Sequence, residues 1–186
     1  DALEYLGPGA FAGCQSLSSI QFPESGEKLS LGSEIFRNCD SLVSVSLSPG
    51  LSVLPEGMFS YCNNLHSVSL GHDLTAISAE GFAWCRELRI INFPEGLQLI
   101  GNDAFVGSGL TRVDLPSSLG TLGRRPFAFS ESLSSINVDP DNTTFIDLEG
   151  VLFSKNLSEL ITYPASKPGI EYFIPETVES VGLHAF

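Results

Sequence analysis

The sequence predicts an α/β solenoid, in which short strands and single helical turns repeat along one axis. One observation is a series of phenylalanines at steps of 25, 23, 23, 23, 22 and 59 residues: Phe11, Phe36, Phe59, Phe82, Phe105, Phe127 and Phe186. The other is the apolar frame around them, L-x-x-I/L-x-x-x-x-F-x-x-C-x-x-L-x-x-I/V-x-F/L. A frame that recurs at this spacing is typical of units that cannot bury their apolar face alone and therefore stack.

The strand of each unit follows its phenylalanine. Apolar residues alternate there with polar ones, as expected for a strand with one buried face. The apolar pairs are Ile20/Phe22, Val45/Leu47, Val68/Leu70, Ile91/Phe93, Val113/Leu115 and Ile136/Val138. Stacking of the units should join these strands into one parallel sheet, whose outward side chains form two columns.

The segment from the phenylalanine to the next frame position suits a single helical turn, because stretches such as 10–14 and 81–85 are rich in small residues. The four cysteines, Cys14, Cys39, Cys62 and Cys85, share one frame position and contain no C-x-x-C pair. We therefore expect a buried column of free thiols that behave as small apolar residues, in preference to a zinc site or disulfides.

The pattern changes after Val138. Residues 139–142 predict a turn, and two alternating runs, 145–153 and 157–163, predict a β-hairpin. The frame returns at 178–186, so the long final step is an enlarged repeat. The chain is thus expected to be one domain over residues 1–186, with regular repeats at 1–138 and the hairpin-bearing repeat at 139–186. Because neither end has a polar cap, we expect a fragment of a longer protein.

These repeats resemble the BspA-like leucine-rich repeats. The likeness is carried by LEYLGPGAFAGCQSLSSIQFP, LIGNDAFVGSGLTRVDLP and ITYPASKPGIEYFIPETVESVGLHAF. The resemblance implies a right-handed, curved stack with a parallel sheet inside and short strands plus helical turns outside. Many members of that family lie on the surfaces of bacteria and protozoa and adhere to host proteins or cells. The resemblance therefore implies an extracellular or cell-surface location.

Charge and hydropathy exclude some partners. The formal net charge is −13, from 22 acidic and 9 basic residues. Nucleic acid and anionic membrane surfaces both require a basic face, so neither is an expected partner. The sequence has no apolar run of about 18 residues, so we expect no transmembrane helix.

No residue pattern indicates catalysis, a metal or a cofactor. His66, His72 and His184 fall at different repeat positions, and the sequence lacks a G-x-S-x-G motif or a glycine-rich phosphate loop. Asp139, Asp141 and Asp147 lack the spacing of a calcium loop and suit a solvated turn. We therefore predict that the protein is not an enzyme and binds no cofactor. Asn142 and Asn156 begin glycosylation sequons, which matter only for a secreted eukaryotic product.

The candidate binding residues lie in two places. The outward columns of the inner sheet include Ser67, Ser69, Ile90, Asn92, Arg112 and Asp114. They suit contact with an extended partner, although small residues here also relieve crowding on a curved sheet. Tyr61 and Trp84 share a position two residues after the phenylalanine, near Arg86 and Arg89. They form either an interface hot spot on a lateral ridge or local packing against the solenoid edge.

The sequence therefore favours a non-enzymatic module that binds a protein or glycan ligand through a concave face, in cell-surface adhesion. The alternative is an intracellular scaffold or a structural subunit of a larger cytoplasmic or organellar assembly that uses the aromatic ridge. An accessory domain attached to an enzyme outside this sequence is a third, weaker hypothesis.

Overall fold

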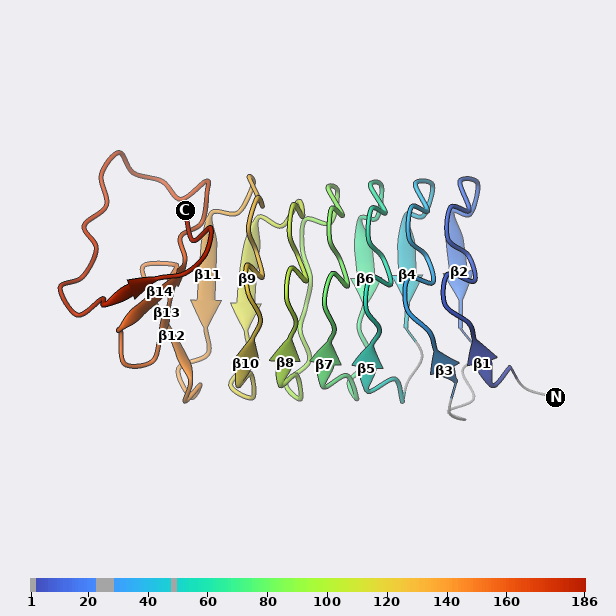
Figure 1. Ribbon diagram of the computed structural model, residues 1–186, viewed down its shortest axis with the longest axis horizontal. Coiled ribbons are helices and arrows are strands. Elements are labelled where there is room, and N and C mark those ends of the chain that lie inside the picture. The colour runs from blue at the N-terminus through green and yellow to red at the C-terminus, as the bar shows by residue number, and fades with distance from the viewer. Residues whose placement is uncertain (1–2, 23–28, 48–49) are drawn as a thin grey trace.

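The computed structural model describes residues 3–22, 29–47 and 50–186. The chain winds into a β-solenoid whose coils stand side by side in one row, with the N-terminus at one end and the C-terminal strands at the other (Figure 1). Each regular coil has a turn-rich segment that carries the phenylalanine, and most coils also have a longer and a two-residue strand. No helix among the described residues is long and apolar enough to cross a membrane.

The longer strands form two parallel sheets, ordered β2-β4-β6 and β9-β11. Their pairing follows the repeat, so that Ser44 pairs with Ser67 and Val113 with Ile136. We call the side on which they lie the long-strand face. Its strands are β2 (Ser19–Gln21), β4 (Ser44–Ser46), β6 (Ser67–Ser69), β9 (Arg112–Leu115) and β11 (Ser135–Val138).

The two-residue strands form a second set of parallel pairs, ordered β1-β3 and β5-β7-β8-β10. Each strand contains the apolar residue that lies five positions before a phenylalanine. The side chain of this apolar residue points inward. We call this side the short-strand face. Its strands are β1 (Tyr5–Leu6), β3 (Ser30–Leu31), β5 (Val53–Leu54), β7 (Ala76–Ile77), β8 (Leu99–Ile100) and β10 (Thr121–Leu122).

The enlarged C-terminal repeat contains β12 (Phe145–Leu148), β13 (Val151–Ser154), β14 (Glu159–Thr162) and β15 (Ser180–Val181). The first three are antiparallel neighbours, and β15 pairs in parallel with β14. The sequence predicted two strands over 145–163, whereas the structure has three. Glu149 and Gly150 adopt left-handed φ values of 50° and 82°, which turn the chain inside the first predicted run.

The core is a column of stacked phenylalanines, as the repeat predicted. Ring centroids of successive members from Phe11 to Phe127 lie 5.2–5.7 Å apart, and interplanar angles stay at or below 19°. Phe186 departs from this column, because it stacks on Tyr163 at 5.0 Å and remains 63% exposed. The enlarged repeat therefore breaks the column after Phe127.

The predicted helical turns are wrong, since the described residues contain no helix. In the segment 9–13, Gly9, Phe11 and Gly13 donate their N–H groups to the next coil, whereas Ala10 and Ala12 close four-residue turns by donating to the carbonyls of Gly7 and Gly9. The residues two positions before and after each phenylalanine of the regular repeats have positive φ: Gly9, Gly13, Glu34, Asn38, Gly57, Tyr61, Glu80, Trp84, Asp103, Gly107, Arg125 and Phe129. A helix needs continuous negative φ, so these residues exclude it.

The prediction of one continuous inner sheet is also wrong. Residues 90–92, expected to form a strand between β6 and β9, have no strand assignment. Ile91 nevertheless stays buried, so the apolar frame continues through the gap. The next coil is one residue shorter, and a Cβ at Gly109 would lie 2.0 Å from the Arg86 carbonyl oxygen. The long-strand face is therefore divided at this coil.

Three of the four cysteines are buried as predicted, and Cys14 is half-buried. Their thiols also form hydrogen bonds, which the sequence interpretation missed. Sγ of Cys39, Cys62 and Cys85 donates to the phenylalanine carbonyl of the preceding coil at 3.0–3.1 Å. In the coils without cysteine, the Ser130 hydroxyl donates to the Phe105 carbonyl at 3.1 Å. This position thus links adjacent coils.

Candidate binding surfaces

The long-strand face presents the residues that the sequence placed in its outward columns. Ser67 and Ser69 are the exposed ends of β6, and Ile90 and Asn92 are exposed in the strandless segment that follows. Ile90 is 65% exposed, although the equivalent outward position on β2, β4 and β6 is serine. Arg112 and Asp114 follow on β9, both exposed.

Arg112 and Asp114 are not independent contact residues. The Arg112 guanidinium donates to the Asp114 carboxylate through Nε and Nη2, with the shortest contact at 2.7 Å. These hydrogen bonds raise the pKa of the Arg112 guanidinium above its already high usual value. Asn137 on β11 donates its amide to the same carboxylate at 2.7 Å. Asp114 thus anchors a polar network across two strands. The sequence had named Arg112 and Asp114 as candidates but not Asn137.

A hollow of about 270 Å³ opens beside this network, where the coil without a strand meets β9 and β11. Its apolar walls come from the frame residues of three coils. Its polar groups are amides and carboxylates, contributed by Asn92, Glu95, Asp114, Asn137 and Asp139. The structure thus brings the predicted residues Asn92 and Asp114 to one site, whereas Ser67 and Ser69 lie outside it.

The predicted ridge is a stack of rings that is longer than expected. Tyr61 stacks on Trp84 with centroids 6.4 Å apart, and Trp84 stacks on Phe129 at 6.3 Å. His184 contacts the far side of Phe129 at 5.1 Å. We call Tyr61, Trp84, Phe129 and His184 the aromatic column. Phe129 shares the repeat position of Tyr61 and Trp84 in the sequence, but it was not named as a candidate because Gly107 separates it from Trp84. His184 was missed because it lies in the enlarged repeat.

Gly107 makes the aromatic column continuous. It occupies the column position in the coil between Trp84 and Phe129, and a Cβ there would lie 2.2 Å from Cε3 of Trp84. The Trp84 ring therefore lies over a position that only glycine leaves open. Trp84 also packs against Ala83, Val106 and Ala128, so that part of its surface is buried in a small apolar cluster.

The faces of the rings in the aromatic column are largely taken by neighbours. The Arg37 guanidinium carbon lies 5.2 Å from the Tyr61 ring centroid, and that of Arg86 lies 5.5 Å from the Trp84 ring. Sugar recognition by aromatic side chains uses a free ring face, whereas protein contacts also use ring edges. This arrangement favours local packing and edge contacts.

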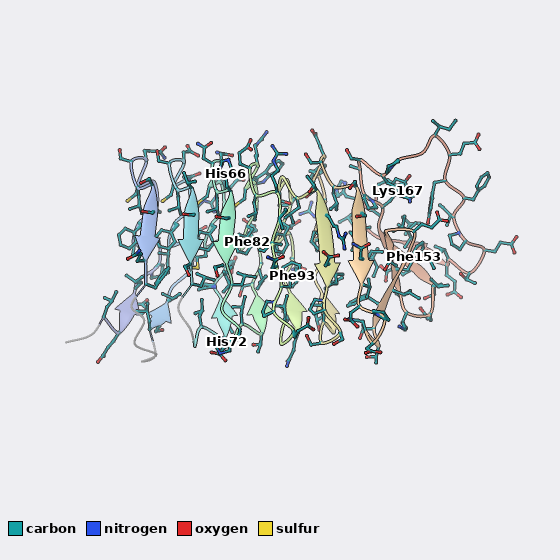
Figure 2. The ribbon with its side chains drawn as sticks, turned by 180° about the vertical axis from the view of Figure 1, so that it is seen from behind. His66, His72, Phe82, Phe93, Phe153 and Lys167 are labelled. Carbon is teal, nitrogen blue, oxygen red and sulfur yellow. The ribbon has the colours of Figure 1, made fainter. Side chains whose placement is uncertain are left out.

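The remaining candidates occupy local structural roles. His66 and His72 lie at opposite ends of their coil (Figure 2), and the Asn64 carbonyl and the Asp73 carboxylate are their respective neighbours. The Asp139 carboxylate accepts the Asp141 N–H within a turn. The Asp147 carboxylate accepts the N–H of Val138 on β11 and that of Gly150 in the β12–β13 turn. In the part of the chain that the structure describes, no group of three His, Cys, Asp or Glu residues could hold a metal ion.

The two sequons differ in accessibility. Asn142 is 1% exposed and its side-chain amide donates to the carbonyls of Pro116 and Leu119. Its side-chain oxygen accepts the N–H groups of Thr144 and Phe145. Asn142 therefore holds a turn and is not accessible to a glycosyltransferase in the folded chain. Asn156 is exposed at the β13–β14 turn.

The repeated frame, the parallel strand pairs and the phenylalanine column all point to one family. The family model of the BspA type leucine rich repeat region matches the chain in six copies, over residues 1–83 and 58–172. The chain belongs to the BspA-type leucine-rich repeat family. Membership identifies a repeat scaffold, in a class of proteins that generally bind protein ligands on their extended faces.

The fold of this chain is also similar to those of solved bacterial leucine-rich repeat proteins. A leucine-rich repeat protein of Bacteroides ovatus is 32% identical, with a TM-score of 0.69 over 75% of this chain and 36% of that one. Another, from Eubacterium ventriosum, is 27% identical, with a TM-score of 0.67 over 79% and 45% of the two chains. The pneumococcal vaccine antigen PcpA is 25% identical, with a TM-score of 0.68 over 98% and 42%.

The chain spans less than half the length of each of these three proteins. A comparison with curated proteins gives no significant match.

Proposed function

We propose that this BspA-type repeat is a non-enzymatic, protein-binding module of a cell-surface protein, and that it contacts its partner through the long-strand face. The observation that carries the proposal is the hollow beside Asp114, because it lies where the face loses its strand, whereas β2, β4 and β6 present only serine and glutamine side chains outward. The exposed Ile90 and the Arg112–Asp114 pair lie at this interruption.

A protein suits this site better than a glycan. Ile90 offers an exposed apolar side chain that would gain from burial against a partner's apolar residue, by roughly 1.5–3 kcal/mol for full burial. The hollow offers acceptors and amides, and its aromatic lining residue, Phe93, is half-buried with its ring packed against Phe105 at 5.6 Å between centroids. With a chain net charge of −13, a partner with a basic patch would be attracted and correctly oriented.

A cell-surface location is supported by the family and by the similarity to PcpA, which is a vaccine antigen. Antigens are reached by antibodies on the outside of a cell.

The test uses the immobilised protein against parallel arrays of purified secreted proteins and of glycans. Ile90→Ser removes the exposed side chain from the long-strand face, and Val53→Ser is its control, since Val53 is 45% exposed on the short-strand face. We expect protein capture that Ile90→Ser weakens about tenfold or more and Val53→Ser leaves unchanged. Equal capture by both variants, or capture of glycans alone, would contradict the proposal.

The aromatic column supports a second candidate, a scaffold that assembles with another protein through the ring edges. Its exposed members are Phe129, at 52%, and His184, and the half-buried Trp84 lies beside them with the exposed Arg86. Aromatic side chains and arginine together suit a protein interface. Phe129→Ser removes this contact and leaves the Tyr61–Trp84 stack in place. If Phe129→Ser weakens protein capture and Ile90→Ser leaves it unchanged, the scaffold replaces the adhesion module as the favoured function.

A further inference from the structure

The short-strand sheet stops at β10 and leaves two acceptors without donors. From β5 onward, the carbonyl of the frame residue in each earlier coil accepts an N–H from the next coil, whereas that of Leu31 does not, because Pro55 stands at the donor position. Leu54, Ile77 and Ile100 accept from Ser78, Gly101 and Gly123 at 2.7–3.0 Å. The equivalent carbonyl in the last regular coil belongs to Leu122, and it has no such donor among the described residues. The Gly120 carbonyl, equivalent to that of Gln98, likewise has none.

The missing neighbour leaves a hollow of about 330 Å³ between β10 and the β14–β15 pair. Leu122, Phe145 and Ile161 form its apolar lining, and Gly182 and Leu183 border the opposite wall. An added Cβ at Gly120 would meet no atom within 4 Å, so the approach to this edge is open. A volume near the lower end of ordinary ligand pockets, roughly 300–1,000 Å³, suits a short peptide segment.

The rim carries positive charge on the β10 side. Arg124 and Arg125 both line the hollow. Arg125 is paired with Asp103 at 2.7 Å. The exposed Arg124 guanidinium forms no ion pair within the described residues. Glu159 on β14 also lines the hollow, so the opposite wall is negative. Arg124 therefore gives the β10 side of the hollow a local affinity for a carboxylate.

We propose that this hollow binds an extended peptide segment of a partner protein, which adds a short parallel strand to β10 and directs an acidic side chain toward Arg124. Two N–H groups of the peptide donate to the Gly120 and Leu122 carbonyls. An apolar side chain rests on Leu122 and Phe145. Strand addition to an open sheet edge is a general mode of peptide recognition, in which backbone bonds give affinity and side-chain pockets give specificity.

The chain itself supplies the probe. Residues 97–103, LQLIGND, form the coil segment that pairs with the preceding strand through the N–H groups of Gln98 and Gly101. Asp103 of that segment already pairs with Arg125 of the following coil. A capped heptapeptide of this sequence presents the same N–H groups to Gly120 and Leu122, and its aspartate to Arg124.

The measurement is an NMR titration of the isotope-labelled protein with this heptapeptide. We expect amide shifts in residues 120–124 and 159–161. Arg124→Ala should weaken binding about three- to tenfold, whereas Arg89→Ala, which removes an exposed positive charge on another coil, should not. A peptide N-methylated at its glycine should lose binding, because it cannot donate to the Leu122 carbonyl. One N-methylated at its asparagine should retain it, since Asn102 N–H bonds no neighbouring coil among the described residues.

Absence of shifts at millimolar peptide would overturn the inference, as would equal binding of the peptide N-methylated at glycine. The inference does not depend on the long-strand face. Ile90→Ser should leave the heptapeptide affinity unchanged, so failure at one site is distinguishable from failure at the other.

Discussion

The substitution Gly107→Ala tests how the aromatic column is built. Gly107 has φ of 63°, and the new Cβ would stand 2.2 Å from the Trp84 ring. The left-handed conformation costs about 1–2 kcal/mol for a residue with a Cβ. Displacement of Trp84 would also weaken its stack on Phe129, which contributes about 0.5–1.5 kcal/mol beyond burial. The free energy of unfolding should therefore fall by about 2–3 kcal/mol.

Gly13→Ala is the matched control. Gly13 occupies the same repeat position with φ of 72°, yet a Cβ there would meet nothing within 4 Å. It should carry only the backbone term of about 1–2 kcal/mol. In a Trp84→Ala background, the destabilisation caused by Gly107→Ala should fall to this smaller value, because the ring that the new Cβ displaces is gone.

Urea unfolding followed by circular dichroism gives the free energies, and fluorescence reports on the column directly because Trp84 is the single tryptophan. We expect Gly107→Ala to change the native emission maximum and Gly13→Ala to leave it unaltered. Equal destabilisation by the two substitutions, with unchanged emission, would refute the argument that Gly107 is kept open for Trp84.

Four further predictions concern single residues. Cys14 alone should react with a thiol reagent in the native protein, because the other three thiols are buried. Burial raises the pKa of Cys62 from 9.0 to about 12, so the folded state retains a proton that the unfolded thiol releases. The contribution of this thiol to the free energy of unfolding should be fully present below pH 9 and should be lost as pH rises from 9 toward 12. Cys62→Ser should reduce this pH dependence in urea titrations. Asn142→Ala should lower the free energy of unfolding by about 2–4 kcal/mol, because it removes four hydrogen bonds from a buried turn, whereas Asn156→Ala should cost under about 1 kcal/mol. Glu80→Gly should raise the free energy of unfolding by up to about 1 kcal/mol, because glycine adopts the φ of 55° without strain. Thermal unfolding would show no gain in stability if Glu80 is not strained.

The stacking of the coils could be predicted from sequence because one residue type recurs at one spacing. Phe36, Phe59 and Phe82 lie in register since each ring fills the same volume in successive coils. A period is a property of the whole chain, and one irregular unit does not hide it. The break at Phe186 was not foreseen, because the sequence alone does not show that Phe186 stacks on Tyr163 instead of on Phe127.

The turn-rich segment was mispredicted because its backbone signal is mixed. Glycine at 9, 13, 57 and 107 indicates left-handed residues on both sides of the phenylalanine. Glu80 and Trp84 occupy the same two positions in another coil and hide that signal, since side chains of this size rarely accept positive φ. Stacking holds them there, because the alternate N–H groups of each coil bond to the next coil.

The candidate sites were harder to predict because both hollows arise from interruptions of a ladder. Ile90 and Asn92 fit the strand pattern as well as Ser67 and Ser69 do, yet only the latter lie in a strand. Similarly, nothing in the letters of residues 120–124 shows that the next coil fails to pair with β10. Sequence periodicity describes what each coil would do beside an identical neighbour, and a binding surface appears where the neighbour differs.

The cysteine position illustrates how hydrogen bonding limits an interpretation based on size alone. If that position needed only a small apolar residue, alanine would serve there, and serine would be costly to bury. Serine occupies the position in the fifth and sixth coils, and Ser130 donates to the Phe105 carbonyl as Cys62 donates to that of Phe36. The common requirement is therefore a small side chain with one donor. Cys62→Ser should accordingly cost less than Cys62→Ala at neutral pH, in urea titrations of the two variants. The opposite order would mean that the thiol is held by packing alone.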